Sequence, residues 1–290
     1  MCFNDTNEQP ALRCQGVGGW EEVATIFTDY GLSYLASVDI IYSPGLTDLP
    51  PLAFGQVGIN AIRFYGTGLI YLESIVFSPE TASQLQSLYI KHNSEFFSLE
   101  NDVPGSLPNL QNLYCSYNKL GNLNGILQPT NVPYIDFGHD SIQTISPNYF
   151  YAASNLTQLL LPFNELKSTE LAAGCFNFSG SGDDLYLDLG WNHLTQGINI
   201  SAFGERMPKE LVLSHNNITT LENAIFAPLL DQMLSAYGDS AYILLDHNEL
   251  ECECDMAWIV EHPGKDLFNL AECADGRLLS SLNMADFAHC

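Results

Sequence analysis

Four of the seven histidines occupy one equivalent position in a recurring pattern, directly before an asparagine or aspartate: His92, His139, His215 and His247. Imidazole is both a metal ligand and a general base near neutral pH. Only His215 and His247 come from successive copies of the pattern, and Ser-His-Asn is a common filler at this place. We therefore interpret these histidines as recurring surface residues and expect no metal site.

Two aspartates share another position of the pattern. Asp136 and Asp188 lie between two apolar residues, two copies apart, which at ~4.8 Å per strand separates them by ~10 Å. A solvated face explains them better than an acid–base pair. The chain also lacks Gly-x-Ser-x-Gly, His-Glu-x-x-His, a P-loop and a dinucleotide-binding glycine motif. We expect no enzyme activity, no catalytic residue and no cofactor.

The pattern that positions these side chains is clearest at 110–120, LQNLYCSYNKL. It matches L-x-x-L-x-L-x-x-N-x-L, the leucine-rich-repeat template. Leu113 and Cys115 are two apart, so on a strand they enter the same core. Asn118 follows at a turn, where its side chain can bond backbone groups that the next coil leaves open.

The template recurs about nine times between residues 35 and 250. The residues at the Asn position are Ser43, Thr67, Asn93, Asn118, Asp140, Asn164, Asn192, Asn216 and Asn248. Because one coil cannot bury its own apolar face, an array of stacked coils is required. We predict a right-handed α/β solenoid, a leucine-rich-repeat horseshoe with a concave parallel β-sheet.

Atypical ends are expected to close the array. The cap at 1–34 holds Cys2 and Cys14, expected as a disulfide unless one or both are free, and a helical pattern from Trp20. The cap at 251–290 is rich in cysteine. Between them, the long step before Asn248 carries apolar residues at helical spacing from Phe226 to Tyr237 and predicts a helix. Cys115 and Cys175 are expected to be free and buried.

The net charge is −25, from 34 acidic and 9 basic residues. Nucleic acids and anionic membranes require basic patches, so neither is an expected partner. The charge itself is better read as an aid to solubility than as a site. No apolar run approaches the ~18 residues that span a bilayer, so we expect no membrane anchor in this chain.

Five N-glycosylation sequons accompany the paired cysteines and predict a secreted, extracellular glycoprotein. They begin at Asn4, Asn155, Asn177, Asn199 and Asn217. The first residues contain neither a basic region nor an apolar one, so we expect no signal peptide in this chain. We expect the chain to be a mature form, a fragment or the product of a mis-started gene prediction.

The C-terminal run from Cys252 to Val260, CECDMAWIV, continues with Cys273 and ends at Cys290. This arrangement is typical of a leucine-rich-repeat C-terminal cap. With the run Trp20–Phe27, it resembles a family of secreted arthropod leucine-rich-repeat proteins. The named member of that family is the non-catalytic subunit of Oplophorus-luciferin 2-monooxygenase. The family's N-terminal cap is richer in cysteine than this one.

The cap resemblance implies disulfides Cys252–Cys273 and Cys254–Cys290. A four-cysteine zinc site is the alternative, but the usual C-x₂₋₄-C pairs are missing. The family resemblance implies a non-enzymatic partner of a small secreted enzyme, an accessory subunit of a luciferase-like oxidoreductase. An extracellular recognition or receptor-like module, and a matrix protein, are the alternatives.

Stacking the coils places outward residues side by side on the concave face, the surface that repeat proteins commonly use for binding. Aromatic residues are enriched at interface hot spots. Alternatively, the rings only pack on one another, or the register is wrong by one in some coils. We predict a protein-binding surface made of Tyr65, Tyr89, Tyr114, Tyr117, Tyr134, Asp136, Leu160, Phe163, Tyr186, Asp188, Trp191 and Tyr242.

Overall fold

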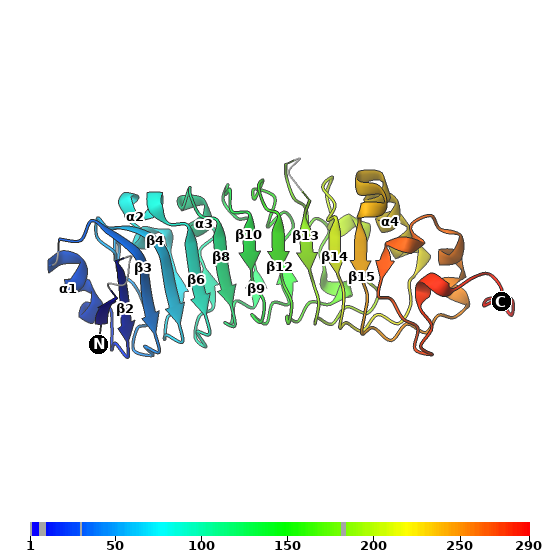
Figure 1. Ribbon diagram of the computed structural model, residues 1–290, viewed down its shortest axis with the longest axis horizontal. Coiled ribbons are helices and arrows are strands. Elements are labelled where there is room, and N and C mark those ends of the chain that lie inside the picture. The colour runs from blue at the N-terminus through cyan, green and yellow to red at the C-terminus, as the bar shows by residue number, and fades with distance from the viewer. Residues whose placement is uncertain (1, 6–9, 30, 181–183) are drawn as a thin grey trace.

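The computed structural model describes residues 2–5, 10–29, 31–180 and 184–290, and of residues 3–5 and 28–29 it describes only the backbone. Figure 1 shows an elongated array in which successive coils lie side by side from the N-terminus to the C-terminus. The solenoid predicted from the repeats is confirmed.

Twelve strands of the described residues form one sheet. Apart from the antiparallel pair β1–β2, neighbouring strands are parallel. In sheet order the strands are β1 (Cys2–Asp5), β2 (Ala11–Gln15), β3 (Tyr34–Ile41), β4 (Gly58–Tyr65), β6 (Ser87–Lys91), β8 (Asn112–Ser116), β10 (Tyr134–Asp136), β12 (Gln158–Leu160), β13 (Tyr186–Asp188), β14 (Glu210–Val212), β15 (Tyr242–Leu244) and β16 (Phe268–Asn269).

The remaining elements lie outside this sheet, and Figure 1 shows α2, α3 and α4 at the edge of the sheet where the strands begin. Two further parallel pairs join β5 to β7 and β9 to β11. The bounds are β5 (Tyr71–Leu72), β7 (Ser98–Leu99), β9 (Asn122–Leu123), β11 (Thr144–Ile145), α1 (Glu21–Asp29), α2 (Pro79–Gln84), α3 (Val103–Ser106) and α4 (Asn223–Tyr237), with 3₁₀ turns at Ser74–Val76, Ser168–Glu170, Ile200–Ala202, Gly238–Ser240, Cys254–Glu261, Lys265–Leu267 and Leu279–Ser281.

The core runs the whole length of the array. Leu113 and Cys115 are fully buried, as the template requires, and the aligned residues of neighbouring strands are buried in the same way. The predicted helix is present as α4, and it buries Phe226, Leu230 and Met233. Cys115 and Cys175 are free and buried, as expected.

A ladder of buried Asn and Asp side chains joins the coils beneath the turns that follow the strands. The Asn118 carbonyl oxygen accepts from the backbone N–H of Asn93 at 3.1 Å, and its amide donates to the carbonyl of Ile90 at 2.8 Å. Both partners belong to the preceding coil, so the expectation that the Asn118 side chain bonds backbone groups of the next coil is wrong. The next coil instead provides an acceptor for Asn118, because the Asn118 N–H donates to the Asp140 side chain at 2.8 Å.

Both ends are closed by disulfides: Cys2–Cys14, Cys252–Cys273 and Cys254–Cys290. The N-terminal cap also extends the sheet, because the β1–β2 hairpin pairs with β3 through β2. The repeat pattern does not predict that hairpin. The division into caps at 1–34 and 251–290 around repeats at 35–250 remains our proposal.

Candidate functional site

Strand register places the predicted outward residues in columns across the sheet. We call this surface the strand face. One column runs through Arg13, Asp39, Arg63, Tyr89, Tyr114, Asp136, Leu160, Asp188, Val212 and Leu244. A second column runs through Asn112, Tyr134, Gln158, Tyr186, Glu210 and Tyr242.

The tyrosines of the strand face are half-buried, and three of them, Tyr89, Tyr114 and Tyr134, are in contact through their rings. The ring centroids of Tyr89 and Tyr114 are 4.6 Å apart, and those of Tyr114 and Tyr134 are 4.9 Å apart. Burial, with Asp136 nearby, raises the pKa of the Tyr134 phenol to about 12. This phenol therefore stays neutral at physiological pH and can donate a hydrogen bond to a partner.

Tyr117, Phe163 and Trp191 are not strand residues. Strand β8 ends at Ser116, β12 at Leu160 and β13 at Asp188. These rings lie in the turns that follow, at the position that histidine occupies in other coils. The prediction that they share the strand face with Tyr114 is therefore wrong, because the turn interrupts the alternation of the strand.

Together with the histidines, these rings form a continuous stack, which we call the ring row. His139 lies between Tyr117 and Phe163, with centroid distances of 3.9 and 4.1 Å. The ring centroids of Trp191 and Phe163 are 4.8 Å apart. The stacked members, in order, are His92, Tyr117, His139, Phe163, Trp191, His215 and His247. Tyr65 and Tyr42 extend the row at its N-terminal end, through a tilted contact with His92 and an edge-on contact with each other.

The backbone of the ring row is held in an unusual conformation. All of its members except Tyr65 have φ between 45° and 61°, the left-handed region, which costs a residue with a Cβ about 1–2 kcal/mol. Each turn is tied to the next coil, for example by the Trp191 N–H donating to the Ser214 carbonyl at 3.0 Å. Strain kept in many consecutive coils is a reason to look for a function at this row.

The ring row presents ring edges to solvent because the ring faces are used in stacking. Tyr117 is 44% exposed, Phe163 41% and Trp191 47%. Large apolar side chains exposed side by side mark interaction surfaces more often than isolated ones do. The row is thus a narrow aromatic strip along the edge of the sheet where the strands end.

Asp136 and Asp188 each bond within the turn that follows them, and Asp136 also pairs with Lys91 at 3.3 Å. Asp136 accepts from the Gly138 N–H at 2.9 Å, and Asp188 accepts from the Gly190 N–H at 2.8 Å. The register places Leu160 between them. Burial raises the pKa of the Asp188 carboxyl. Both carboxylates shape the turns that carry the ring row, and neither contacts the other.

A charged hollow of about 310 Å³ lies at the N-terminal end of the strand face, and the sequence analysis missed it. Arg63 pairs with Asp39 at 2.8 Å and lies 4.8 Å from the centre of the Tyr89 ring. Lys91 and Arg13 also line the hollow. With only nine basic residues in the chain, three in one hollow is a clear local departure from the acidic whole. Arg13, Arg63 and Lys91 all occupy outward strand positions, and this was the feature of the sequence from which the hollow could have been predicted.

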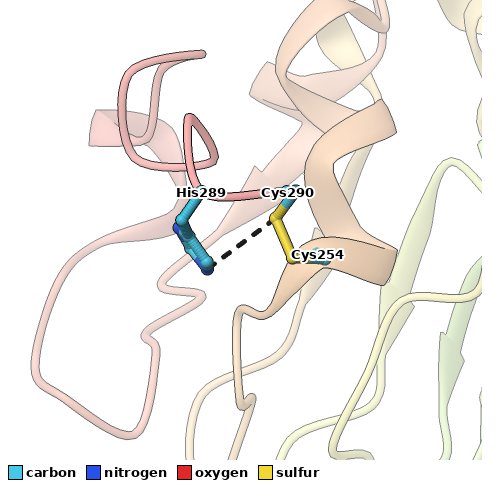
Figure 2. A group of neighbouring side chains, drawn as sticks. All are labelled: Cys254, His289 and Cys290. Atoms are coloured by element: carbon cyan, nitrogen blue, oxygen red, sulfur yellow. Dashed lines mark hydrogen bonds between the residues drawn. A yellow bond between two sulfur atoms is a disulfide. The ribbon is translucent and has the colours of Figure 1, made fainter.

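Two groups of side chains among the described residues combine several metal-ligand types. One is Cys254, His289 and Cys290, where Figure 2 shows the two sulfur atoms joined and the His289 ring beside them, with Nε2 3.7 Å from Cys290 Sγ. Thiolates, not disulfide sulfurs, are the metal ligands that cysteine supplies. The oxidised cap therefore offers no sulfur ligand. The other group is His215, Asp246 and His247.

The sequon asparagines differ in how accessible their amides are. Asn155, Asn199 and Asn217 are exposed. The side chain of Asn4 lies outside the described residues. Asn177 is half-buried, and its amide nitrogen donates to the side chain of Asn148 at 2.7 Å.

We therefore expect glycan occupancy at Asn155, Asn199 and Asn217 to exceed that at Asn177, where a glycan has to displace this hydrogen bond. Site-resolved glycopeptide mass spectrometry of protein from a glycosylating host measures it. Equal or higher occupancy at Asn177 would contradict the expectation.

No protein-family model matches the chain. It is 27% identical over 172 residues to lumican from Gallus gallus, a match that covers 59% of this chain and 46% of lumican. The chain thus spans just under half the length of this relative. It is also 23% identical to the Oplophorus-luciferin 2-monooxygenase non-catalytic subunit of Oplophorus gracilirostris, over 95% of this chain and 81% of that protein.

Among solved structures, human 5T4 matches 96% of this chain and 94% of its own, with a TM-score of 0.55 at 16% identity. The chain has the leucine-rich-repeat fold. FLRT2, solved in an octameric complex with Latrophilin 3 and Unc5D, gives a TM-score of 0.55 at 17% identity over 86% of this chain. No helix among the described residues is both long and apolar enough to cross a membrane.

Proposed function

We propose that this leucine-rich-repeat protein is secreted and binds a protein partner through the strand face and the ring row, without catalysing a reaction itself. The observation that carries the proposal is the ring row, a continuous stack held in left-handed turns and partly exposed. Rings already packed against one another lose little conformational freedom when a partner covers them, and that lowers the entropic cost of binding.

The charged hollow complements the aromatic strip. Arg63, Lys91 and Arg13 provide donors at one end of the strand face, while Asp188 and Glu210 place carboxyl groups on the neighbouring strands β13 and β14. A partner that presents carboxylates opposite the hollow and basic groups opposite β13 and β14 is bound in one orientation. Such complementarity sets orientation and association rate more than affinity.

We further propose that the partner is a small secreted enzyme, with the chain as its accessory, non-catalytic subunit. The relative matched over 95% of this chain bears the name of a non-catalytic subunit, and this supports the proposal. An extracellular recognition module or matrix protein without an enzyme partner is the second candidate. The shorter match to lumican favours it.

The test is affinity capture from native extracellular fluid, using the glycosylated, disulfide-intact protein as bait and mass spectrometry as the readout. The accessory-subunit proposal predicts one small enzyme in near-equimolar amount, with oxidoreductase activity in the captured fraction. Recovery of matrix components, or of no enzyme, would overturn it and leave the second candidate.

A further inference from the structure

The C-terminal end of the ring row brings two imidazoles and a carboxylate together from neighbouring coils. His215 lies in the turn after β14, while Asp246 and His247 lie in the turn after β15. One potential ligand atom from each residue lies within 4.8 Å of the other two. Asp246 Oδ2 is 3.7 Å from His247 Nε2.

The carboxylate is oriented by a second hydrogen bond. Asp246 Oδ1 accepts from the hydroxyl of Ser214, and this leaves Oδ2 on the side of His247. The backbone N–H of His215 donates to the Asp246 carbonyl at 3.0 Å, which fixes the two turns relative to each other. Outer hydrogen bonds of this kind orient ligands in metal sites.

Two imidazoles, one carboxylate and an open position form a donor set that zinc takes in proteins. Magnesium and calcium prefer all-oxygen ligands, so the nitrogen donors favour zinc, cobalt, nickel or copper over them. We propose that His215, Asp246 and His247 bind one zinc-class divalent cation. The proposal stands independently of the protein partner.

Binding requires the two imidazoles to turn. Their rings are stacked, with centroids 4.0 Å apart and planes at 14°, so the in-plane lone pairs run side by side rather than converging. His247 is exposed and His215 half-buried, which leaves room for rotation toward a shared ion at ~2.0–2.1 Å from each nitrogen. Turning His215 separates it from Trp191, whose ring centroid is 3.7 Å away.

This geometry gives the site its own optical signal. The chain has three tryptophans. Trp191 is the tryptophan of the ring row, and its ring stacks on the proposed ligand His215. Zinc binding should therefore change the tryptophan fluorescence of the wild-type protein. A Trp191→Phe variant should bind zinc with unchanged affinity but without that change.

The experiment is calorimetric titration of the disulfide-intact protein with zinc chloride, alongside the fluorescence titration. The expected result is one equivalent bound, not displaced by a large excess of calcium, with affinity at least tenfold weaker in His215→Gln, His247→Gln and Asp246→Asn. His139→Gln is the matched control, since His139 occupies the same left-handed position of the ring row without belonging to the group, and it should bind as the wild type does.

Circular dichroism confirms that each variant is folded before it is titrated. Absence of zinc binding to the wild type would overturn the proposal. So would equal binding by the His215→Gln and His247→Gln variants, or binding that calcium abolishes, because the acidic surface alone then accounts for the uptake.

Discussion

Replacing Asp140 by asparagine is expected to raise the free energy of unfolding at pH 8 by about 2–4 kcal/mol and to change it little at pH 4. Asp140 is fully buried, and every other ladder position from Asn93 to Asn248 is occupied by asparagine. Its Oδ1 accepts from the Asn118 N–H, but its Oδ2 has no hydrogen-bond partner among the described residues. Burial raises the pKa of this carboxyl from 3.8 to about 8.

The direction of the pH dependence follows from proton uptake. Between pH 4 and pH 8 the folded protein keeps the Asp140 proton, whereas the unfolded chain releases it. The unfolded state then binds fewer protons, and stability falls as pH rises through this window. At ~1.4 kcal/mol per pH unit the loss amounts to several kcal/mol. Asparagine cannot ionise, so the variant avoids this loss.

Asparagine also fits the ladder locally. At the equivalent places, the amides of Asn118 and Asn164 donate to a carbonyl of the preceding coil, each at 2.8 Å. Urea unfolding at pH 4, 6 and 8 measures the difference between variant and wild type. Asp239→Asn, at an exposed site, is the matched control and should give no such trend. A stability difference for Asp140→Asn that does not grow with pH would contradict the account.

Replacing both Phe163 and Trp191 by alanine is expected to weaken partner binding by at least ~2 kcal/mol, about thirtyfold in Kd, with little loss of stability. Aromatic residues that act as interface hot spots contribute this much each. Both rings are more than 40% exposed, so removing them opens no closed cavity in the core. Surface plasmon resonance with the captured partner measures the binding affinity, and thermal unfolding measures the stability.

The matched control for this pair is Phe97→Ala with Tyr151→Ala. These rings are 58% and 51% exposed, but they lie outside both the strand face and the ring row. The control should bind with wild-type affinity. Unfolding of the Phe163 and Trp191 variant would instead mean that the ring row is structural, and equal weakening by both pairs would remove the case for this surface.

The fold was predictable because the template constrains each coil in the same way. Leu113 and Cys115 enter the core, and Asn118 satisfies backbone groups that the stacking of coils leaves inside. These requirements are local and repeat along the chain. The β1–β2 hairpin was not predictable by this argument, because a terminal coil has no neighbour on one side and departs from the template.

The sequence alone does not reveal the ring row, because its members belong to two residue classes, aromatic residues and histidines. Tyr117 follows Cys115 by two residues, so strand alternation gives it the parity of the core, yet its left-handed φ of 61° turns it outward. His139 and His215 occupy the same position, but their residue type alone indicates only recurring surface histidines. Only the distances between rings show that phenol, indole and imidazole form one stack.

The central claim is that a partner covers the ring row, and hydroxyl-radical footprinting of the complex tests it most directly. Oxidation of Tyr117, Phe163 and Trp191 is compared in the free protein and in the complex, with Phe97 and Tyr151 as exposed references. The account predicts that the three ring-row residues are protected and that the two references are not. Protection of the references with unchanged oxidation of the ring row would show that the partner binds elsewhere and would contradict the account.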